Sequence, residues 1–73
     1  MNMTSVLSGQ IEAVGHDAAS STLGVKFKAG SVYHYSNVTY PQYMELIGAK
    51  SIGHHFGKNF KDNENHPFER QRD

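Results

Sequence analysis

Apolar and polar residues alternate most regularly over residues 22–28 of the chain. Leu23, Val25 and Phe27 fall on one face of an extended segment, and the residues between them fall on the other face. A period of two is typical of a half-buried β-strand. After a short link, residues 31–35 are rich in β-branched and aromatic side chains, which favour strands. The two segments therefore predict an antiparallel hairpin.

Two registers are possible for this hairpin, and they place its tyrosines on different faces. A two-residue loop turns Tyr33 and Tyr35 away from the face of Phe27, whereas a three-residue loop ending at Gly30 places them on it. We favour the longer loop because the shorter one needs a positive φ at Ala29, which alanine resists. The longer loop also gathers three polar residues on the opposite face: Lys26, Lys28 and His34.

Weaker patterns predict the elements on either side of the hairpin. Residues 10–16 alternate weakly and indicate a further strand. Thr39 is a suitable N-cap for a helix from about Tyr40 to Ala49, in which Pro41 is tolerated in the first turn. Four apolar residues of this segment follow helical spacing, namely Tyr40, Tyr43, Met44 and Ile47.

A second helical segment is predicted only as a short turn. Phe56 and Phe60 stand four residues apart, which suits one helical turn, but Gly57 between them weakens the prediction. The fold class that follows is α+β: a small three-stranded antiparallel β-meander packed by one α-helix plus a short C-terminal helical turn.

The two ends of the chain contain little that would order them. Residues 1–7 are expected to be flexible, residues 8–61 to form the domain, and residues 62–73 to form a polar tail. Phe68 is the only apolar residue of that tail, so it buries too little to order itself. We expect disorder there, relieved only where Pro67-Phe68 docks.

Composition limits the chain to one small core. It has 73 residues, of which 37% are hydrophobic, and no cysteine that could form a disulfide. A core of this size contributes only about 3–5 kcal/mol, so we expect help from self-association and predict a homo-oligomer. No run of apolar residues is longer than two, which excludes a membrane span or signal peptide and predicts a cytoplasmic protein.

The formal net charge of +0 hides an uneven distribution of charge. Between Glu45 and Asp62 there is no acidic residue. This segment carries lysines that suit phosphate contacts, two histidines and small hydrogen-bonding residues. The candidate binding residues in it are Lys50, Ser51, His54, His55, Lys58, Asn59 and Lys61. The alternative is a solvated surface balanced by the acidic residues of the tail.

Tyr33 and Tyr35 complete the set of candidate binding residues. They could form a stacking platform for bases, as aromatic residues do on sheet-based RNA readers. The alternative, which the favoured register supports, is that both rings fill the core beneath the helix.

Neither metal binding nor catalysis has a recognisable motif. His54 and His55 are adjacent, no pair of histidines has metal-ligand spacing, and cysteine is absent. No motif frames a nucleophile, and a chain of this length leaves little room for a walled pocket. We therefore expect no cofactor, no metal and no enzymatic activity.

The spacing of apolar, glycine and aromatic residues along the chain also forms an ordered series. It reads Ile11; Val14-Gly15-x-Asp17; Leu23-x-Val25-x-Phe27-x-x-Gly30; Tyr33-x-Tyr35; Val38; Ala49-x-Ser51-x-Gly53-x-x-Phe56-x-x-x-Phe60. Over residues 8–61 this series resembles the KTSC domain, which is named for a C-terminal region of some lysyl-tRNA synthetases. The sequence departs from the family at His16, where an aromatic residue is frequent, at Pro41, which is displaced, and at Phe60, where an aliphatic residue is usual.

The resemblance implies a compact three-stranded sheet with a helix, used as a stand-alone protein in bacteria or phages. Attachment to a synthetase suggests RNA binding. The first hypothesis is therefore a small RNA-binding module in which Lys50, Lys58 and Lys61 contact phosphates. The alternative is a phage or bacterial accessory protein that binds a protein partner or its own copies. Such an oligomer could also hold a small phosphorylated ligand at a subunit cleft.

Overall fold

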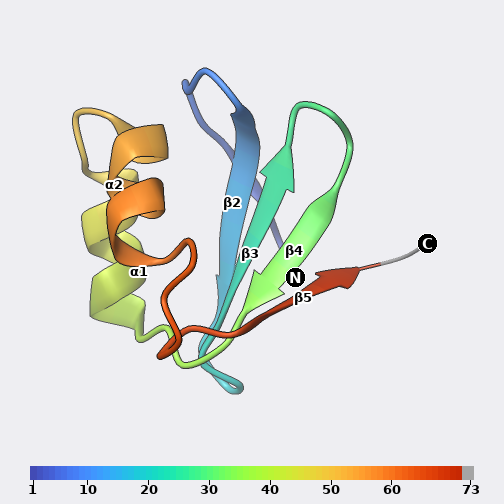
Figure 1. Ribbon diagram of the computed structural model, residues 1–73, viewed down its shortest axis with the longest axis vertical. Helices are drawn as coiled ribbons and strands as arrows, with labels where there is room; N and C mark the ends of the chain where they lie inside the picture. The colour runs from blue at the N-terminus through green and yellow to red at the C-terminus, as the bar shows by residue number, and fades with distance from the viewer. Residues whose placement is uncertain (72–73) are drawn as a thin grey trace.

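The computed structural model describes residues 1–71, in which an antiparallel sheet carries two helices on one side (Figure 1). The elements in chain order are β1 (Thr4–Ser5), β2 (Ile11–Asp17), β3 (Thr22–Phe27), β4 (Val32–Tyr35), α1 (Tyr40–Ile47), α2 (Ile52–Asn59) and β5 (Phe68–Gln71). Among these residues, no helix is long and apolar enough to cross a membrane. The α+β class is confirmed.

The sheet contains five strands in the order β1-β2-β3-β4-β5, so the prediction of three strands was wrong. The predicted strands are the three central ones, and a short strand pairs with each edge of them. Neither edge strand has a hydrophobic pattern of its own, because β1 has two residues and β5 has one apolar residue, Phe68. Pairing with an open backbone edge, which offers free N–H and C=O groups, forms these strands instead.

The hairpin of β3 and β4 has the three-residue loop that the sequence favoured. The Phe27 amide donates to the Ser31 carbonyl at 2.9 Å, and Gly30 has a φ of 103°. Gly30 therefore takes the left-handed backbone that closes this loop at little steric cost. Tyr33 and Tyr35 consequently share the face of Phe27, as predicted.

The core lies between this sheet face and the two helices. Its buried residues come from every element except β1 and β5, and from Val38 and Phe60 in the connections. They are Ile11, Val14, Leu23, Val25, Tyr35, Val38, Tyr43, Leu46, Ile52, Phe56 and Phe60. The single small core that composition predicted is thus present in residues 1–71.

Helix α1 begins where the sequence predicted. The Thr39 hydroxyl accepts from the Gln42 amide, and the Gln42 side chain accepts from the Thr39 amide at 2.9 Å, which forms a capping box. The predicted buried face was partly wrong, because Tyr40 is 56% exposed and Met44 is 44% exposed. Tyr43 and Leu46 are the buried residues, because α1 meets β2 and α2 along that stripe.

Helix α2 is a full helix of eight residues rather than a single turn. The Ser51 hydroxyl caps it by accepting from the His54 amide at 3.3 Å. Ile52 and Phe56 are buried one turn apart, and Phe60 at its C-cap continues the same stripe. Gly57, which weakened the prediction, lies on the exposed side, so the core loses no side chain there.

The N-terminal residues are more ordered than the expected flexible segment 1–7. Thr4 and Ser5 of β1 pair with Val14 and Ala13 of β2. The side chain of Met1 lies over Gly24, where an added Cβ would stand only 2.5 Å from its sulfur. Because Gly24 has no side chain, the N-terminal segment can pack closely against the outer face of the sheet.

The tail also differs from the expected disorder, as far as Gln71. His66 is buried and its Nδ1 lies 3.1 Å from the Ser36 carbonyl, and the Ser36 amide donates to the Pro67 carbonyl at 2.8 Å. Phe68 then packs against the tyrosines of β4. These few contacts order a polar segment whose composition alone predicts disorder. Residues 72–73 of the predicted tail lie outside the described part of the chain.

Candidate functional site

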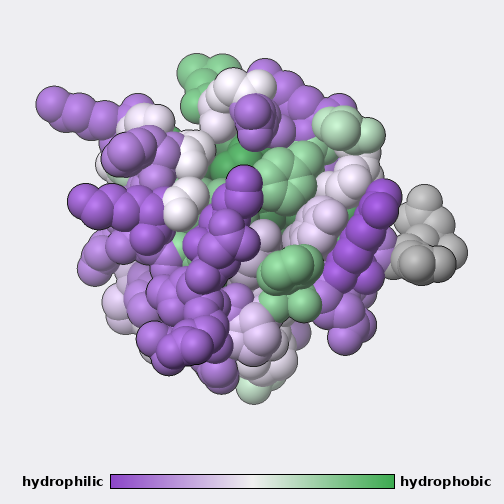
Figure 2. Space-filling model, in the orientation of Figure 1, coloured by the Kyte–Doolittle hydropathy of each residue, from purple (hydrophilic) through white to green (hydrophobic). Residues whose placement is uncertain are grey.

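A groove of about 820 Å³ opens between α2 and the helix-facing side of β3, β4 and β5. Figure 2 shows it as an apolar area bordered by hydrophilic side chains. We call it the aromatic groove. Its lining comprises Ser8, Gly9, Gln10, Ile11, Phe27, Lys28, Ala29, Ser31, Tyr33, Tyr35, Ser51, Gly53, Phe56, Lys61, Asp62 and Phe68. The concave surface therefore combines residues from both ends and the middle of the chain.

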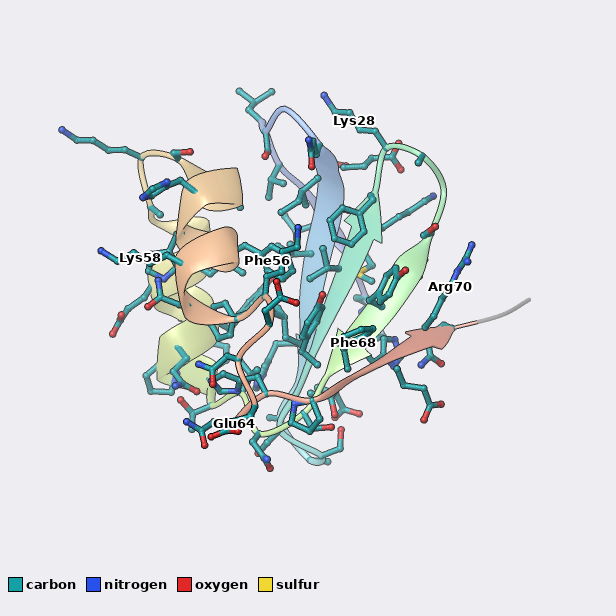
Figure 3. The ribbon with its side chains drawn as sticks, in the orientation of Figure 1. Lys28, Phe56, Lys58, Glu64, Phe68 and Arg70 are labelled. Carbon is teal, nitrogen blue, oxygen red and sulfur yellow. The ribbon has the colours of Figure 1, made fainter. Side chains whose placement is uncertain are left out.

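Aromatic rings form the floor of this groove. Tyr33 lies edge-on to Phe27 with ring centroids 5.7 Å apart, and Tyr35 lies edge-on to Phe56 at 5.2 Å. Phe68 packs on the two tyrosines at 5.4 and 5.6 Å. The two edge-to-face contacts, Tyr33 with Phe27 and Tyr35 with Phe56, fix ring orientation, whereas the Phe68 ring is tilted against both tyrosines. Phe56 points from α2 toward the sheet, and Phe68 lies over β4 (Figure 3).

The two tyrosines of β4 differ in burial. Tyr35 is only 4% exposed and belongs to the core, whereas Tyr33 is half-buried. Both line the groove. Burial raises the pKa of the Tyr35 phenol above its ordinary value of 10.0, and the neighbouring Tyr33 and Asp62 side chains raise it further. Its hydroxyl therefore stays protonated at neutral pH and can donate a hydrogen bond.

Charged residues border the aromatic floor at two places. Lys28 lies at the turn between β3 and β4 (Figure 3), and Lys61 and Asp62 follow α2. The sequence placed Lys28 with Lys26 and His34 on the opposite face, which was wrong for Lys28. It belongs to the loop rather than to the strand, so the alternation of the strand does not fix its direction.

A second, shallower concavity of about 410 Å³ lies on the other side of α2. We call it the outer α2 surface. It is lined by Ala49, Lys50, Ser51, His54, His55, Lys58 and Asn59. Lys58 points away from the sheet (Figure 3), and Lys50 and His54 are exposed as well. This surface has cationic and hydrogen-bonding groups but no aromatic floor.

The structure divides the nine predicted binding residues between these two surfaces. Tyr33, Tyr35 and Lys61 line the aromatic groove, and Ser51 lines both. The other predicted residues line the outer α2 surface alone: Lys50, His54, His55, Lys58 and Asn59. The segment between Glu45 and Asp62, which has no acidic residue, is thus not one continuous site. Its side chains lie on opposite sides of helix α2.

Several lining residues were not predicted from the sequence. Phe27 could have been found, because the favoured register already placed it beside the tyrosines. The sequence predicted that Pro67-Phe68 could dock, but it did not indicate that Phe68 would dock in this groove. Asp62 gave no usable signal, since it stands in a polar stretch whose path over the sheet depends on tertiary contacts. Ser8 and Ser31 are common loop residues that no motif marks.

Histidines do not gather with acidic residues in residues 1–71, where no group of three metal-binding side chains occurs. His16, which departs from the family pattern, has a packing contact instead. Its Nε2 donates to the Val38 carbonyl at 2.6 Å, and its ring stacks on Tyr43 with centroids 5.4 Å apart. It lies outside the lining of the aromatic groove.

Comparison with known proteins identifies relatives of this chain. The sequence model of the KTSC domain matches residues 7–63. An uncharacterized protein of Stutzerimonas stutzeri strain A1501 is 31% identical over 61 residues, which are 84% of this chain and 86% of that protein. The crystal structure of a KTSC domain protein from Yersinia pestis superposes with a TM-score of 0.88, 22% identity and 97% coverage of both chains, which shows a shared fold.

Proposed function

This chain belongs to the KTSC domain family, and we propose that it is a small non-enzymatic module that binds single-stranded RNA in the aromatic groove. The aromatic floor carries the proposal, because the rings of Tyr33 and Phe68 lie at a groove opening where a base can reach them. Phe68 is 56% exposed although it is a large apolar residue. Stacking one base on such a ring contributes about 1–3 kcal/mol.

The borders of the groove suit the backbone of the same ligand. Lys28 and Lys61 are positioned for phosphates, and the hydroxyls of Ser31 and Ser51 suit ribose or phosphate oxygens. Lys50 and Lys58, which the sequence also suggested as phosphate contacts, lie on the outer α2 surface, where only a longer strand would reach them. Because the net charge is +0, binding should be modest and strongly dependent on salt.

Fluorescence anisotropy with a labelled RNA heptamer tests this proposal. We expect the double variant Lys28→Ala/Lys61→Ala to lose about tenfold or more in affinity at about 0.1 M salt, and Lys50→Ala/Lys58→Ala to lose little. Absence of binding to the unmodified protein at low salt would reject the proposal. Equal losses in both double variants would reject the assignment to the groove.

Contact with a protein, including a second copy of this chain, is the other candidate. Leu7 is 99% exposed beside the groove residues Ser8 and Gly9, and β5 is an open sheet edge. A dimer could also hold a small phosphorylated ligand at the subunit boundary. Sedimentation equilibrium with and without Leu7→Ser separates this candidate from RNA binding, because only self-association changes the mass of the protein alone.

A further inference from the structure

Strand β5 carries two side chains on the face of the sheet that forms the aromatic groove. In the register of β4 and β5, Phe68 lies opposite Tyr35 and Arg70 lies opposite Tyr33. Directly opposed residues of antiparallel strands point to the same face, and both tyrosines line the groove. Phe68 and Arg70 therefore stand along one border of the groove, with their Cα atoms about 7 Å apart.

The pairing of the two strands brings Arg70 close to the groove, although it is not itself a lining residue. The Ser36 amide donates to the Pro67 carbonyl at 2.8 Å, so these opposed residues form a hydrogen-bonded pair. Such pairs alternate along antiparallel strands with non-hydrogen-bonded pairs, in which the side chains are closer. The pair of Tyr33 and Arg70 lies three positions further along and is therefore of the closer kind.

Ser31 orients the Arg70 side chain. The Arg70 Nη2 donates to the Ser31 Oγ at 3.2 Å, and Ser31 lines the groove. Figure 3 shows Arg70 extending from β5 toward the loop between β3 and β4. Within residues 1–71 this is the single hydrogen bond of the guanidinium, which forms no salt bridge there. The other N–H groups of its planar fork are thus available to a ligand, and their geometry matches phosphate oxygens.

We propose that Phe68 and Arg70 hold one nucleotide together, with its base stacked on the Phe68 ring and its phosphate bound by the guanidinium that Ser31 orients. This inference rests on the proposed binding of single-stranded RNA, and it adds β5 as the element that positions the nucleotide. The ribose that links a base to its phosphate fits the spacing of these two side chains. Because the family model ends at residue 63, both contacts come from a segment that the KTSC sequence pattern does not cover.

Anisotropy with the labelled RNA heptamer tests the contact from Arg70. Loss of one phosphate contact removes about 0.7 from the slope of log K against log salt concentration, so Arg70→Gln should bind about fivefold more weakly at about 0.1 M salt. Lys58→Gln is the matched control, because it removes one exposed positive charge outside the groove lining. If the unmodified protein does not bind RNA at low salt, the proposed function itself fails. If it binds and the two variants have equal affinity, RNA binding stands and the inference is rejected.

Two further variants separate phosphate binding from a purely structural role of Arg70. Arg70→Lys keeps the positive charge but not the planar fork, so it should preserve the salt slope and still weaken binding. Ser31→Ala should weaken binding in the unmodified chain and less so in Arg70→Gln, because the serine acts through the guanidinium. Urea denaturation checks that each variant is folded. A salt slope that falls as far in Arg70→Lys as in Arg70→Gln, or equal effects of Ser31→Ala in both backgrounds, would overturn the inference.

Discussion

The two sides of helix α2 show how differently one short segment can contribute to the molecule. The inner side, with Phe56, forms a wall of the aromatic groove, whereas the outer side, with Lys58, faces solvent (Figure 3). The two surfaces share Ser51, and both carry lysine. Only the inner one adds aromatic rings.

A cluster of positive charge is by itself weak evidence for a site. Exposed lysines attract any polyanion over a short distance and are screened by salt, so they neither orient a ligand nor distinguish it. An apolar floor with a few placed polar groups does both. We therefore propose ligand binding in the aromatic groove rather than on the outer α2 surface.

The largest effect expected from this comparison is on stability. Phe56→Ala removes a ring that contacts Phe27, Tyr35 and Phe60, and it should reduce the free energy of unfolding by about 3–5 kcal/mol. That loss is comparable with the whole stability of a domain this small, so the variant should be largely unfolded. Urea denaturation followed by circular dichroism measures it. Lys58→Ala on the opposite side should change the free energy by less than about 0.5 kcal/mol.

A smaller effect is expected on ligand affinity. Phe68→Leu keeps an apolar residue on β5 but removes the flat ring, and it should weaken RNA binding by about 1–3 kcal/mol, measured by anisotropy. Met44→Leu is the matched control, because Met44 is a partly exposed apolar residue of α1 outside the groove. Unchanged affinity in Phe68→Leu would show that no base stacks on this ring.

The salt dependence of binding should separate the lysines of the two surfaces. Each lysine that neutralises a phosphate of a single strand contributes about 0.7 to the slope of log K against log salt concentration. Lys28→Ala and Lys61→Ala should each reduce the slope by about that amount. Lys50→Ala and Lys58→Ala should leave it unchanged, and the opposite pattern would move the ligand to the outer α2 surface.

The smallest expected effect is a pH dependence of stability from Tyr35. Its pKa is raised in the folded protein above the ordinary 10.0, so the folded state holds its proton more tightly than the unfolded state. The contribution of the protonated Tyr35 phenol to folding stability is complete below pH 10, and it is lost as the pH rises from that value through the raised pKa of Tyr35. Urea midpoints between about pH 9 and 11 should fall less in Tyr35→Phe than in the unmodified protein.

The centre of the fold could be predicted from the sequence because its signals are local. The alternation of Leu23, Val25 and Phe27, the glycine at the loop, and the Thr39 cap each depend on neighbours in the chain. The KTSC family was confirmed for the same reason, since its residue series spans these elements.

The edge strands and much of the groove could not be predicted, because they depend on contacts between distant segments. Phe68 is ordered by rings about thirty residues earlier in the chain, and His66 by the Ser36 carbonyl. The single aromatic residue of this polar segment indicated that Pro67-Phe68 could dock, but no periodicity indicated where it would dock or that it would form a strand. The length of α2 was underestimated because Gly57 lowers the intrinsic helix propensity of the segment. Burial of Ile52 and Phe56 in the core stabilises the full helix despite that glycine.

Nuclear magnetic resonance tests the central claim, that the aromatic groove is the ligand site, most directly. Backbone amide shifts of the isotope-labelled protein would be followed during titration with the RNA heptamer. We expect the largest changes at Ser8, Lys28, Tyr33, Asp62 and Phe68, with little change at Lys50, His54 and Lys58. Changes confined to the outer α2 surface, or no changes at low salt, would contradict the account.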